Sequence, residues 1–535
     1  MRGVELAEAL ARVLPTDRVS VAPADRVSYA RDAWPRTLIA IQHGVVAPNP
    51  PDVVVWPEST DEVVRVVRVA NELGVPIVPY GAGSGVAGGA QAIRSGIVLD
   101  TKRMARLVSL DEQDLSATFE AGLNGDHVEH ELMRRGYTLG HFPSSIMCST
   151  FGGWLAARSA GQLSTKYGKI EDMALSLEVV TGRGDVLHTG QAPRGAPGPD
   201  FTQLFVGSEG TLGVITRGTV RIWRAPERRI LGGWEFPRVE AGCEAIRRLL
   251  QRGLRPAVVR LYDELDTLTH RKGGDDHPTV GDTPVERDLA AAALPPGPLH
   301  ETLGRIGKAL FQGVLSSHTP VKIEWINRAI ETVAPRAGSG CLLILGFEGA
   351  PALTEAEAKM ARTELLRAGG KDLGEGPGQR WFEHRYKISF KQPRMFRNGA
   401  FVDTMEVATT WDRLIDLYRG VRASVERHAV VLAHFSHAYP DGCSIYFTFA
   451  SAGSDREEAE RRYDALWTAA LGAVTRAGAT ISHHHGVGML KAPFMADEHG
   501  EGMAVYRALK QVFDPNGIMN PGKMGLLERP PAGPA

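Results

Sequence analysis

The sequence is poor in cysteine, has almost no net charge and contains no long apolar run. Its four cysteines are widely spaced and form no Cys-x-x-Cys pair, which argues against a disulfide framework and a zinc knuckle. The 61 basic and 62 acidic residues give a formal net charge of −1, so the overall charge provides no field that attracts nucleic acid. The lack of any run of ~18 apolar residues argues against a membrane-spanning helix.

The N-terminal residues also lack the apolar core and the cleavage site of a secretion signal. Together with the scarcity of cysteine, this favours a reducing compartment, and we expect a cytoplasmic protein. The 535 residues exceed what one hydrophobic core usually serves, so the length predicts two or more domains. No internal repeat is visible, which argues against solenoids and propellers.

The first part of the chain has an α/β pattern. Ser59 and Glu62 have the spacing of a capping box, valines then recur with a helical period, and Gly74 ends the predicted helix. The apolar run at 96–100 predicts a strand, and the β-branched segment 175–190 predicts a hairpin. A further helix is expected near residues 127–136.

From about Arg224 the pattern changes to long amphipathic helices that alternate with strands such as CSIYFTFA. This pattern predicts a second, antiparallel α+β domain. We expect domain bounds of 1–223, 224–480 and 481–535. The segment 269–301 is rich in proline, glycine and aspartate, and its composition is typical of an exposed connection, a lid or a plain surface insertion.

A glycine-rich turn follows the short apolar run VPIVP, residues 75–79. Gly83, Gly85 and Gly88 have the GxGxxG spacing, but a Rossmann fingerprint must open a helix, and here the helix precedes the glycines. The loop can still bring many backbone N–H groups close to a phosphate, although a tight turn without a ligand is the simpler interpretation. Two further segments rich in small residues, 141–161 and 207–216, favour a bound cofactor.

The order of the motifs PYGAGSGVAGG, PSSIMCSTFGGW, YGKIEDM, VTGRGDV and GSEGTLGVIT resembles the FAD-binding domain of the vanillyl-alcohol oxidase/PCMH flavoprotein superfamily. The resemblance covers roughly residues 50–220. It implies an α+β fold with a VAO/PCMH-type FAD-binding domain, an antiparallel α+β cap domain and a C-terminal segment that returns to the flavin. The segment QVFDPNGIMNPGKMG, residues 511–525, resembles the closing signature of FAD-linked oxidases.

The resemblance also implies which residues contact FAD. The first loop contains Ser84 and no histidine, so noncovalent FAD is expected. The residues assigned to the cofactor are Pro79, Tyr80, Gly81, Ala82, Gly83, Ser84, Gly85, Ser144, Ser145, Ser149, Thr150, Ala157, Arg158, Ser159, Ala160, Glu209, Gly210, Thr211, Gly213, Val214 and Ile215.

The segment ISHHHGVGMLK, with YGKIEDM, RLYDE and GCSIYFTFA, resembles the alkylglycerone-phosphate synthase (alkyldihydroxyacetonephosphate synthase) family over most of the chain. This resemblance implies an FAD enzyme that exchanges the acyl group of an acylated dihydroxyacetone phosphate for a fatty alcohol, without net redox change. A small-molecule or lipid-like substrate is therefore expected. We also expect a homodimer, with peripheral but not integral membrane contact and no nucleic-acid partner.

Three adjacent histidines first suggest a metal site. In an extended segment, neighbouring side chains point to opposite sides, so His483 and His485 would share a face and His484 would face away. We therefore expect no metal. The resemblance places the triplet at the phosphate end of the substrate and at the flavin, with His483 in substrate binding and His484 and His485 in catalysis; structural placement is the alternative.

The strand CSIYFTFA alternates apolar residues with hydroxyl-bearing ones, and Tyr446 lies on the hydroxyl-bearing face. An ordinary half-buried tyrosine would fit this pattern equally well. The resemblance assigns Tyr446 as general acid/base, a role that requires neighbours such as the histidines to lower its pKa. It also matches Arg260 to a family arginine that is important for activity, here assigned to substrate binding.

One position departs from the family pattern, because the substrate-binding arginine of the family falls on Gln392. A neutral amide does not bind a carboxylate or phosphate as a guanidinium does. Gln392 therefore also suits the alternative function, an FAD-linked oxidase or dehydrogenase of a 2-hydroxy acid, with His484 or His485 as base. HFSHAYPDG at His434 faintly resembles a metal motif of that group. A noncatalytic flavin-binding protein would require the tyrosine and the histidines to be coincidental.

Overall fold

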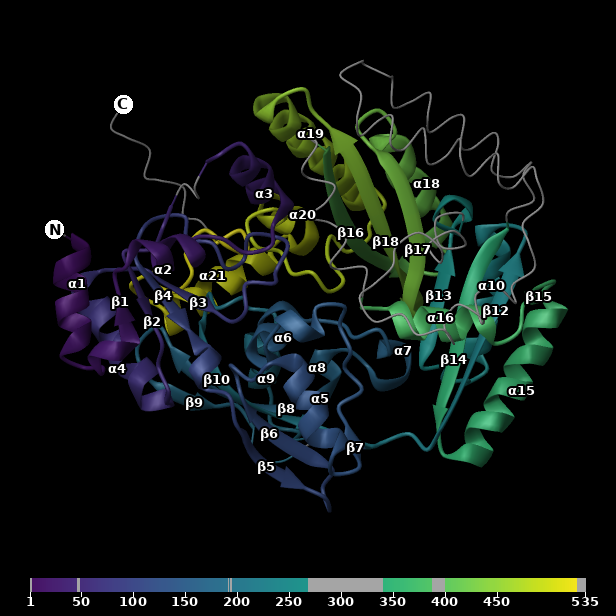
Figure 1. Cartoon of the computed structure of the whole chain (residues 1–535), viewed down its shortest axis with the longest axis horizontal. Helices are drawn as coiled ribbons and strands as arrows, with labels where there is room; N and C mark the ends of the chain where they lie inside the picture. Colours follow the sequence, from purple (N-terminus) through teal and green to yellow (C-terminus); the bar gives the residue numbers. More distant parts are fainter. Residues whose placement is uncertain are drawn as a thin grey trace, which may run out of the picture. The chain divides into compact units, whose positions relative to one another are not determined.

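The computed structural model of the chain describes residues 2–45, 49–190, 192, 195–267, 340–386 and 400–526. Gln392 and the segment 269–301 lie outside the described residues. The chain divides into two compact units (Figure 1): unit 1 comprises residues 1–226 and 478–535, and unit 2 comprises residues 227–477. Within the described ranges, no helix is long and apolar enough to cross a membrane.

The first sheet of unit 1 is a small mixed sheet. Strands β2 and β3 run parallel to β4, and β1 is antiparallel to β2. Ser59 caps helix α4 by accepting a hydrogen bond from the Glu62 N–H at 3.3 Å, and Gly74 ends the helix with φ of 62°, so both predicted helix signals are confirmed. In sheet order the strands are β1 (Val19–Ser20), β2 (Val53–Val55), β4 (Ile97–Asp100) and β3 (Ile77–Tyr80), and α4 (Thr60–Leu73) joins β2 to β3.

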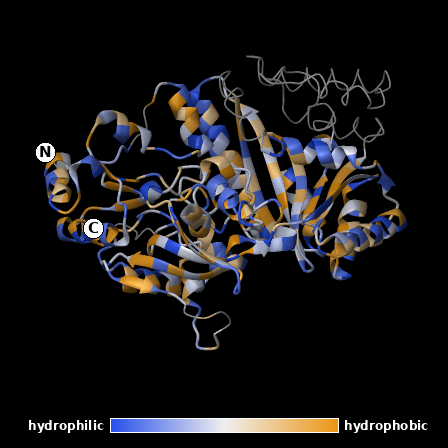
Figure 2. Cartoon of the chain, turned by 60° about the horizontal axis from the view of Figure 1, so that its bottom comes forward, coloured by the Kyte–Doolittle hydropathy of each residue, from blue (hydrophilic) through white to orange (hydrophobic). Residues whose placement is uncertain are grey.

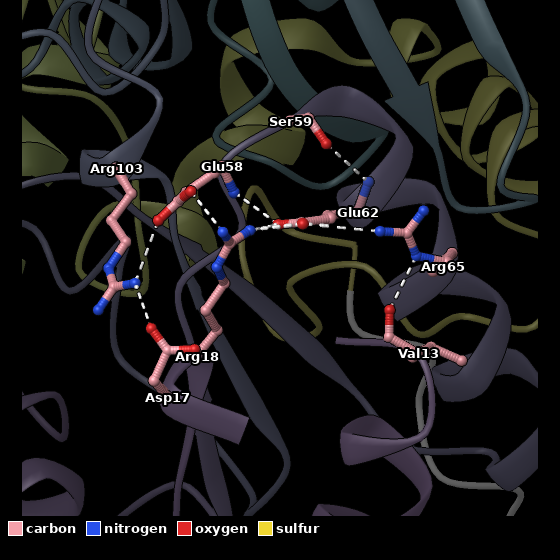
Figure 3. A network of polar contacts seen from close by, with 8 residues as sticks. All are labelled: Val13, Asp17, Arg18, Glu58, Ser59, Glu62, Arg65 and Arg103. Atoms are coloured by element: carbon pink, nitrogen blue, oxygen red, sulfur yellow. Dashed lines mark hydrogen bonds and ion pairs between the residues drawn. The ribbon is translucent and has the colours of Figure 1, made fainter. Parts of the chain in front are cut away.

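The start of α4 is held by a cluster of ion pairs (Figure 3). The Glu62 carboxylate accepts a hydrogen bond from the Glu58 N–H at 2.8 Å and pairs with Nη1 of Arg18 at 2.5 Å. Glu62 therefore turns back toward the preceding residues, as a capping box requires, but it bonds to the N–H of Glu58 where the motif would use that of Ser59. Arg18 also reaches Glu58, and so ties the segment before β1 to the helix start.

The second sheet of unit 1 is antiparallel throughout. Its strands, in sheet order, are β5 (Leu107–Asp111), β6 (Ser116–Glu120), β10 (Gly213–Arg221), β8 (Ala174–Thr181) and β9 (Val186–His188). The hairpin of β8 and β9 was predicted from the sequence. The helix expected near 127–136 begins earlier, because the Asn124 side chain accepts from the Asp126 N–H and starts α5 (Gly125–Met133) there.

The C-terminal segment completes unit 1. The Ile77 N–H of β3 donates to the Ile518 carbonyl at 2.7 Å, and the Asn520 N–H donates back to the Ile77 carbonyl at 2.8 Å. Ile518 and Met519 belong to the same apolar cluster as the valines of α4. The remaining elements of unit 1 are α1 (Arg2–Ala11), α2 (Pro23–Ser28), α3 (Pro35–Gln42), β7 (Tyr137–Thr138), α6 (Phe151–Ala157), α7 (Ser164–Tyr167), α8 (Ile170–Met173), α9 (Phe201–Phe205), β11 (Trp223–Arg224), α20 (Met495–His499) and α21 (Gly502–Phe513).

Unit 2 contains one antiparallel sheet with helices packed against it (Figure 1). The strands, in sheet order, are β15 (Lys371–Asp372), β12 (Arg228–Phe236), β14 (Cys341–Gly349), β13 (Val258–Tyr262), β17 (Val430–Ala438), β18 (Gly442–Ala452) and β16 (Ala400–Thr410). The helices are α10 (Val239–Gln251), α15 (Pro351–Arg367), α16 (Gly376–His384), α18 (Leu414–Val425) and α19 (Arg456–Arg476). Many of these helices carry both apolar and polar residues, as expected for elements with one buried side (Figure 2).

Helices α10, α18 and α19 cover one face of this sheet. Gly242 of α10 lies against Leu261 of β13, where an added Cβ would come within 2.6 Å of the leucine side chain. Tyr418 of α18 stacks beside Phe447 of β18, with ring centroids 6.3 Å apart. Side chains alternate along strands, so the residues between these positions lie on the opposite face. We call it the Tyr446 face, and it carries Arg260, Tyr262, His434 and Tyr446.

Candidate functional site

In unit 1, the glycine-rich loop lies between β3 and β4, and no helix follows it. The structure therefore agrees with the prediction that GxGxxG is not a Rossmann fingerprint here. Gly83 has φ of 66°, and an added Cβ would come within 1.9 Å of the Tyr80 hydroxyl oxygen. Among the described residues, the backbone N–H groups of 82–86 donate no hydrogen bond to the protein. The loop thus presents a row of backbone donors to a ligand.

The second predicted segment packs directly against this loop. An added Cβ at Gly81 would lie 2.3 Å from the Thr150 hydroxyl oxygen, so only glycine fits here without a shift. Thr150 caps α6 by accepting from the Gly153 N–H at 3.3 Å, and Ser149 accepts from the Trp154 indole N–H at 2.8 Å. Ser149 and Thr150 therefore shape the segment through contacts within the protein.

The third segment contains Glu209, which is partly buried. Its two carboxylate oxygens accept hydrogen bonds from the Val487 N–H at 2.5 Å and from the Gly488 N–H at 2.8 Å. Burial raises the pKa of Glu209, and the two N–H groups act in the opposite direction. The side chain of Glu209, a residue that the resemblance assigns to the cofactor, holds the loop that follows the histidine triplet. No motif in the sequence indicates this contact between distant segments.

The closing signature, residues 511–525, forms hydrogen bonds to the same region. The Asn520 side-chain amide donates to the Gly89 carbonyl at 2.9 Å and to the Glu209 carbonyl at 2.6 Å. Lys523 donates to the Gln91 carbonyl at 2.7 Å, and burial lowers the pKa of this lysine to about 8. Residues of the closing signature therefore help to hold three parts of unit 1 together. These are the glycine-rich loop, the turn at Glu209 and the loop of residues 486–488 after the histidine triplet, which we call the histidine loop.

The histidine triplet does not alternate as an extended segment would. The Nδ1 atoms of His483 and His484 lie 3.0 Å apart, and the rings of His484 and His485 meet edge to face at 4.6 Å between centroids. The expectation that His484 points away from His483 was wrong, because the segment bends here. Lys169 donates to the His483 carbonyl at 2.6 Å and fixes the bend. In the part of the chain that the structure describes, no group of three or more His, Cys, Asp or Glu residues could hold a metal ion.

Two assigned residues use their side chains elsewhere in unit 1. Arg158 directs its Nε to the Val206 carbonyl at 3.1 Å. The Thr211 hydroxyl donates to the Ser208 carbonyl at 2.7 Å and lies 3.0 Å from the Tyr506 hydroxyl. Any cofactor contact by these two residues would therefore have to come from the backbone or from the remaining side-chain atoms.

An FAD pyrophosphate suits the glycine-rich loop. A pyrophosphate needs several converging N–H donors and close approach of the backbone. The loop offers the donors of 82–86, and the contacts at Gly81 and Gly83 leave no room for larger side chains. The residues present in unit 1 thus fit the cofactor that the motif order implies.

In unit 2, Tyr446 lies on β18 directly opposite His434 of β17 and Glu406 of β16. The rings of Tyr446 and His434 stack, with centroids 4.7 Å apart and an angle of 16° between their planes. Nε2 of His434 lies 2.9 Å from Nη2 of Arg260, and Nδ1 lies 3.3 Å from Oδ2 of Asp266. The sequence analysis missed Asp266 and Glu406, which carry no motif that would have marked them.

Burial raises the pKa of Tyr446 to about 12, while a hydrogen bond with Thr404 acts in the opposite direction. The general acid/base role implied by the resemblance required neighbours that lower this pKa, and the pKa of Tyr446 is instead raised. At neutral pH the phenol keeps its proton, so in these surroundings Tyr446 is a hydrogen-bond and proton donor.

Residues 51–190 match the family described as FAD binding domain, and residues 225–524 match the family described as FAD linked oxidases, C-terminal domain. The alkyldihydroxyacetonephosphate synthase of Trypanosoma brucei brucei is 30% identical over 540 aligned residues, which cover 98% of this chain and 80% of that protein. A glycolate oxidase subunit of Bacillus subtilis is 27% identical over 522 residues, covering 97% and 96%. A solved alkyldihydroxyacetonephosphate synthase structure has a TM-score of 0.72 at 26% identity, covering 97% of this chain and 85% of its own.

Proposed function

The chain belongs to the FAD-linked oxidase family and is an FAD-dependent enzyme, and from this premise we propose that it acts as an alkyldihydroxyacetonephosphate synthase. In this reaction the bond between the methylene carbon of dihydroxyacetone phosphate and the ester oxygen breaks, and the fatty acid leaves with both of its oxygens. The oxygen of a fatty alcohol bonds to the same carbon, and the proton of the alcohol balances the departing acid. The observation that carries the proposal is the similarity to the trypanosomal enzyme over almost the whole chain.

The residues of unit 2 supply groups suited to this chemistry. Tyr446 holds a proton on its phenolic oxygen and can donate it to the substrate. Arg260 carries a permanent positive charge that binds the anionic end of the substrate. Bound FAD contributes an electron-accepting ring system, and we assign its pyrophosphate to the backbone of 82–86.

A second candidate function is the oxidation of a 2-hydroxy acid. The similarity to the glycolate oxidase subunit, which spans nearly the full length of both chains, favours it. A guanidinium binds a carboxylate as well as it binds a phosphate, so Arg260 suits this substrate equally. Under this alternative, His484 or His485 would take the hydroxyl proton.

Two assays on the FAD-loaded enzyme distinguish these functions. The first follows a labelled acylated dihydroxyacetone phosphate with a fatty alcohol, and we expect the label to be released as free acid while the ether product forms. The second mixes the enzyme anaerobically with D-2-hydroxy acids, and we expect the flavin absorbance to stay unchanged. Bleaching of the flavin without any exchange would reject the synthase proposal in favour of the oxidase.

FAD is expected to bind without a covalent link. The first loop contains Ser84 and no histidine, so it offers no imidazole to attach to the flavin. Precipitating the holoenzyme with acid should therefore release all the flavin into the supernatant, as measured by its absorbance and fluorescence. Flavin that remained with the washed polypeptide would contradict this prediction.

A further inference from the structure

His434 lies in the middle of a chain of polar contacts on the Tyr446 face. Its ring connects Asp266 on one side with Arg260 on the other, through distances of 3.3 Å and 2.9 Å. His434 is 7% exposed and Asp266 is 6% exposed. Because both side chains are buried, a lost hydrogen bond to either of them would cost free energy of folding. The roles predicted from the sequence for Arg260 and His434 did not include these contacts.

The chemistry of Arg260 determines the proton position on His434. A guanidinium only donates hydrogen bonds, so Nε2 of His434 must accept from Nη2 of Arg260. The ring proton is therefore on Nδ1, where it faces the Asp266 carboxylate. Both nitrogens are engaged, which leaves neither of them for a metal ion or for a substrate proton.

We propose that His434 is a positioning residue that orients Arg260 toward the anionic group of the substrate. The inference rests on the proposed function only in requiring a substrate with a phosphate or carboxylate. His434 accepts from one guanidinium donor, so the planar group can still form paired bonds with an anion. The rings of Tyr262 and Trp381 lie 5.9 Å and 5.8 Å from the guanidinium carbon and also restrict its movement.

The same ring also fixes the proton donor. His434 stacks on Tyr446 at 4.7 Å between centroids, so the plane that orients Arg260 also orients the phenol. Asp266 holds that plane by accepting from Nδ1. One buried carboxylate thus sets the direction of both groups that face the substrate.

Two nearly isosteric variants of the full-length FAD enzyme distinguish the contact of His434 with Asp266 from its contact with Arg260. In His434→Asn the amide nitrogen takes the place of Nδ1 and can still donate to Asp266, but no atom remains to accept from Arg260. In His434→Gln the amide oxygen can reach the place of Nε2 and accept from Arg260, while the contact with Asp266 is lost. The readouts are kcat, KM and the inhibition constants of inorganic phosphate and of glycolate.

We expect His434→Asn to raise KM and the inhibition constant of one of these two anions by about 10- to 100-fold, because a hydrogen bond to a charged group is lost. We expect kcat to change less than KM, and His434→Gln, which keeps the acceptor for Arg260, to raise KM by a clearly smaller factor than His434→Asn. The anion that responds identifies the substrate class. Equal effects of the two variants, or unchanged anion inhibition in His434→Asn, would overturn the inference. Recovery of activity on adding a divalent metal would also overturn it.

Arg260→Lys gives a second test if His434→Asn does not fold. A lysine keeps the charge but cannot form the planar contact with Nε2, so the same selective rise in KM is expected. An unchanged KM would overturn the inference. A wild-type enzyme that catalyses no exchange would reject the proposed function, but the two inhibition constants would still report how His434 and Arg260 bind an anion.

Discussion

Replacing Tyr446 with phenylalanine is expected to lower kcat by about 10²- to 10⁴-fold, the usual contribution of a positioned proton donor. The ring and its stacking on His434 remain, and only the hydroxyl is removed. KM and FAD content should change little, because the guanidinium of Arg260 and the flavin-binding residues of unit 1 are untouched. The measurement is steady-state turnover at saturating substrate, with flavin absorbance as the check on cofactor content.

Tyr439→Phe is the matched control for this prediction. Tyr439 lies in the turn between β17 and β18 and has no role in the proposed chemistry, so its loss should leave kcat within about twofold, in line with an ordinary surface change. Since burial raises the pKa of Tyr446 to about 12, the wild-type pH profile should show no ionisation of this phenol near neutral pH. A Tyr446→Phe enzyme as active as the wild type would remove Tyr446 from the mechanism.

Replacing Gly488 with alanine is expected to abolish stable FAD binding. Gly488 has φ of 53°, and an added Cβ would lie 2.1 Å from the Ala87 carbonyl oxygen of the glycine-rich loop. Backbone cannot rotate out of the way as a side chain can, so either the glycine-rich loop or the histidine loop must shift. The left-handed backbone costs about 1–2 kcal/mol, and the overpacking about 1–3 kcal/mol more. Flavin content after gel filtration and the thermal midpoint measure the two effects.

Gly74→Ala separates the clash from the backbone strain. Gly74 also has a left-handed φ, 62°, but an added Cβ meets nothing within 4 Å. This control should therefore lose only the about 1–2 kcal/mol of stability that the left-handed backbone costs. It should keep its flavin. A Gly488→Ala enzyme that retained FAD as well as Gly74→Ala would show that the contact between the two loops is not needed for the cofactor.

The local parts of the fold were predictable because their signals lie within a few residues. Ser59 and Gly74 mark the ends of α4, and the alternation around Tyr446 gave the correct strand face. The order of helix, glycines and strand was enough to reject a Rossmann fingerprint. Each of these inferences depends on backbone conformation or side-chain periodicity, which neighbouring residues determine.

The contacts that build the candidate site were not predictable in the same way. Glu209 accepts hydrogen bonds from Val487 and Gly488, although the whole of unit 2 separates these residues in the sequence, and no motif links the two segments. His434 drew attention only as part of a faint metal motif, whereas its partner Asp266 comes from a distant segment. The bend at the histidine triplet depends on Lys169, so a local rule for extended chains failed there.

The pKa of Tyr446 shows the same limit. A general acid/base role required histidines that lower it, but the dominant effect is burial, which depends on how the whole sheet is packed. Glu406, which is fully buried on the neighbouring strand, acts in the same direction as burial. Electrostatic surroundings of this kind are assembled from several strands and cannot be obtained from one.

The discontinuous build of unit 1 has a consequence for synthesis. Strand β3 stays incomplete until Ile518 and Asn520 pair with Ile77, and ribosomes add about 5–20 residues per second. For roughly 20–90 s the nascent chain therefore has an open sheet edge at β3. During this time the glycine-rich loop and the turn at Glu209 also lack their hydrogen bonds to the closing signature. FAD capture is thus expected to follow synthesis of the closing segment, residues 511–525, because until then the edge of β3 stays open.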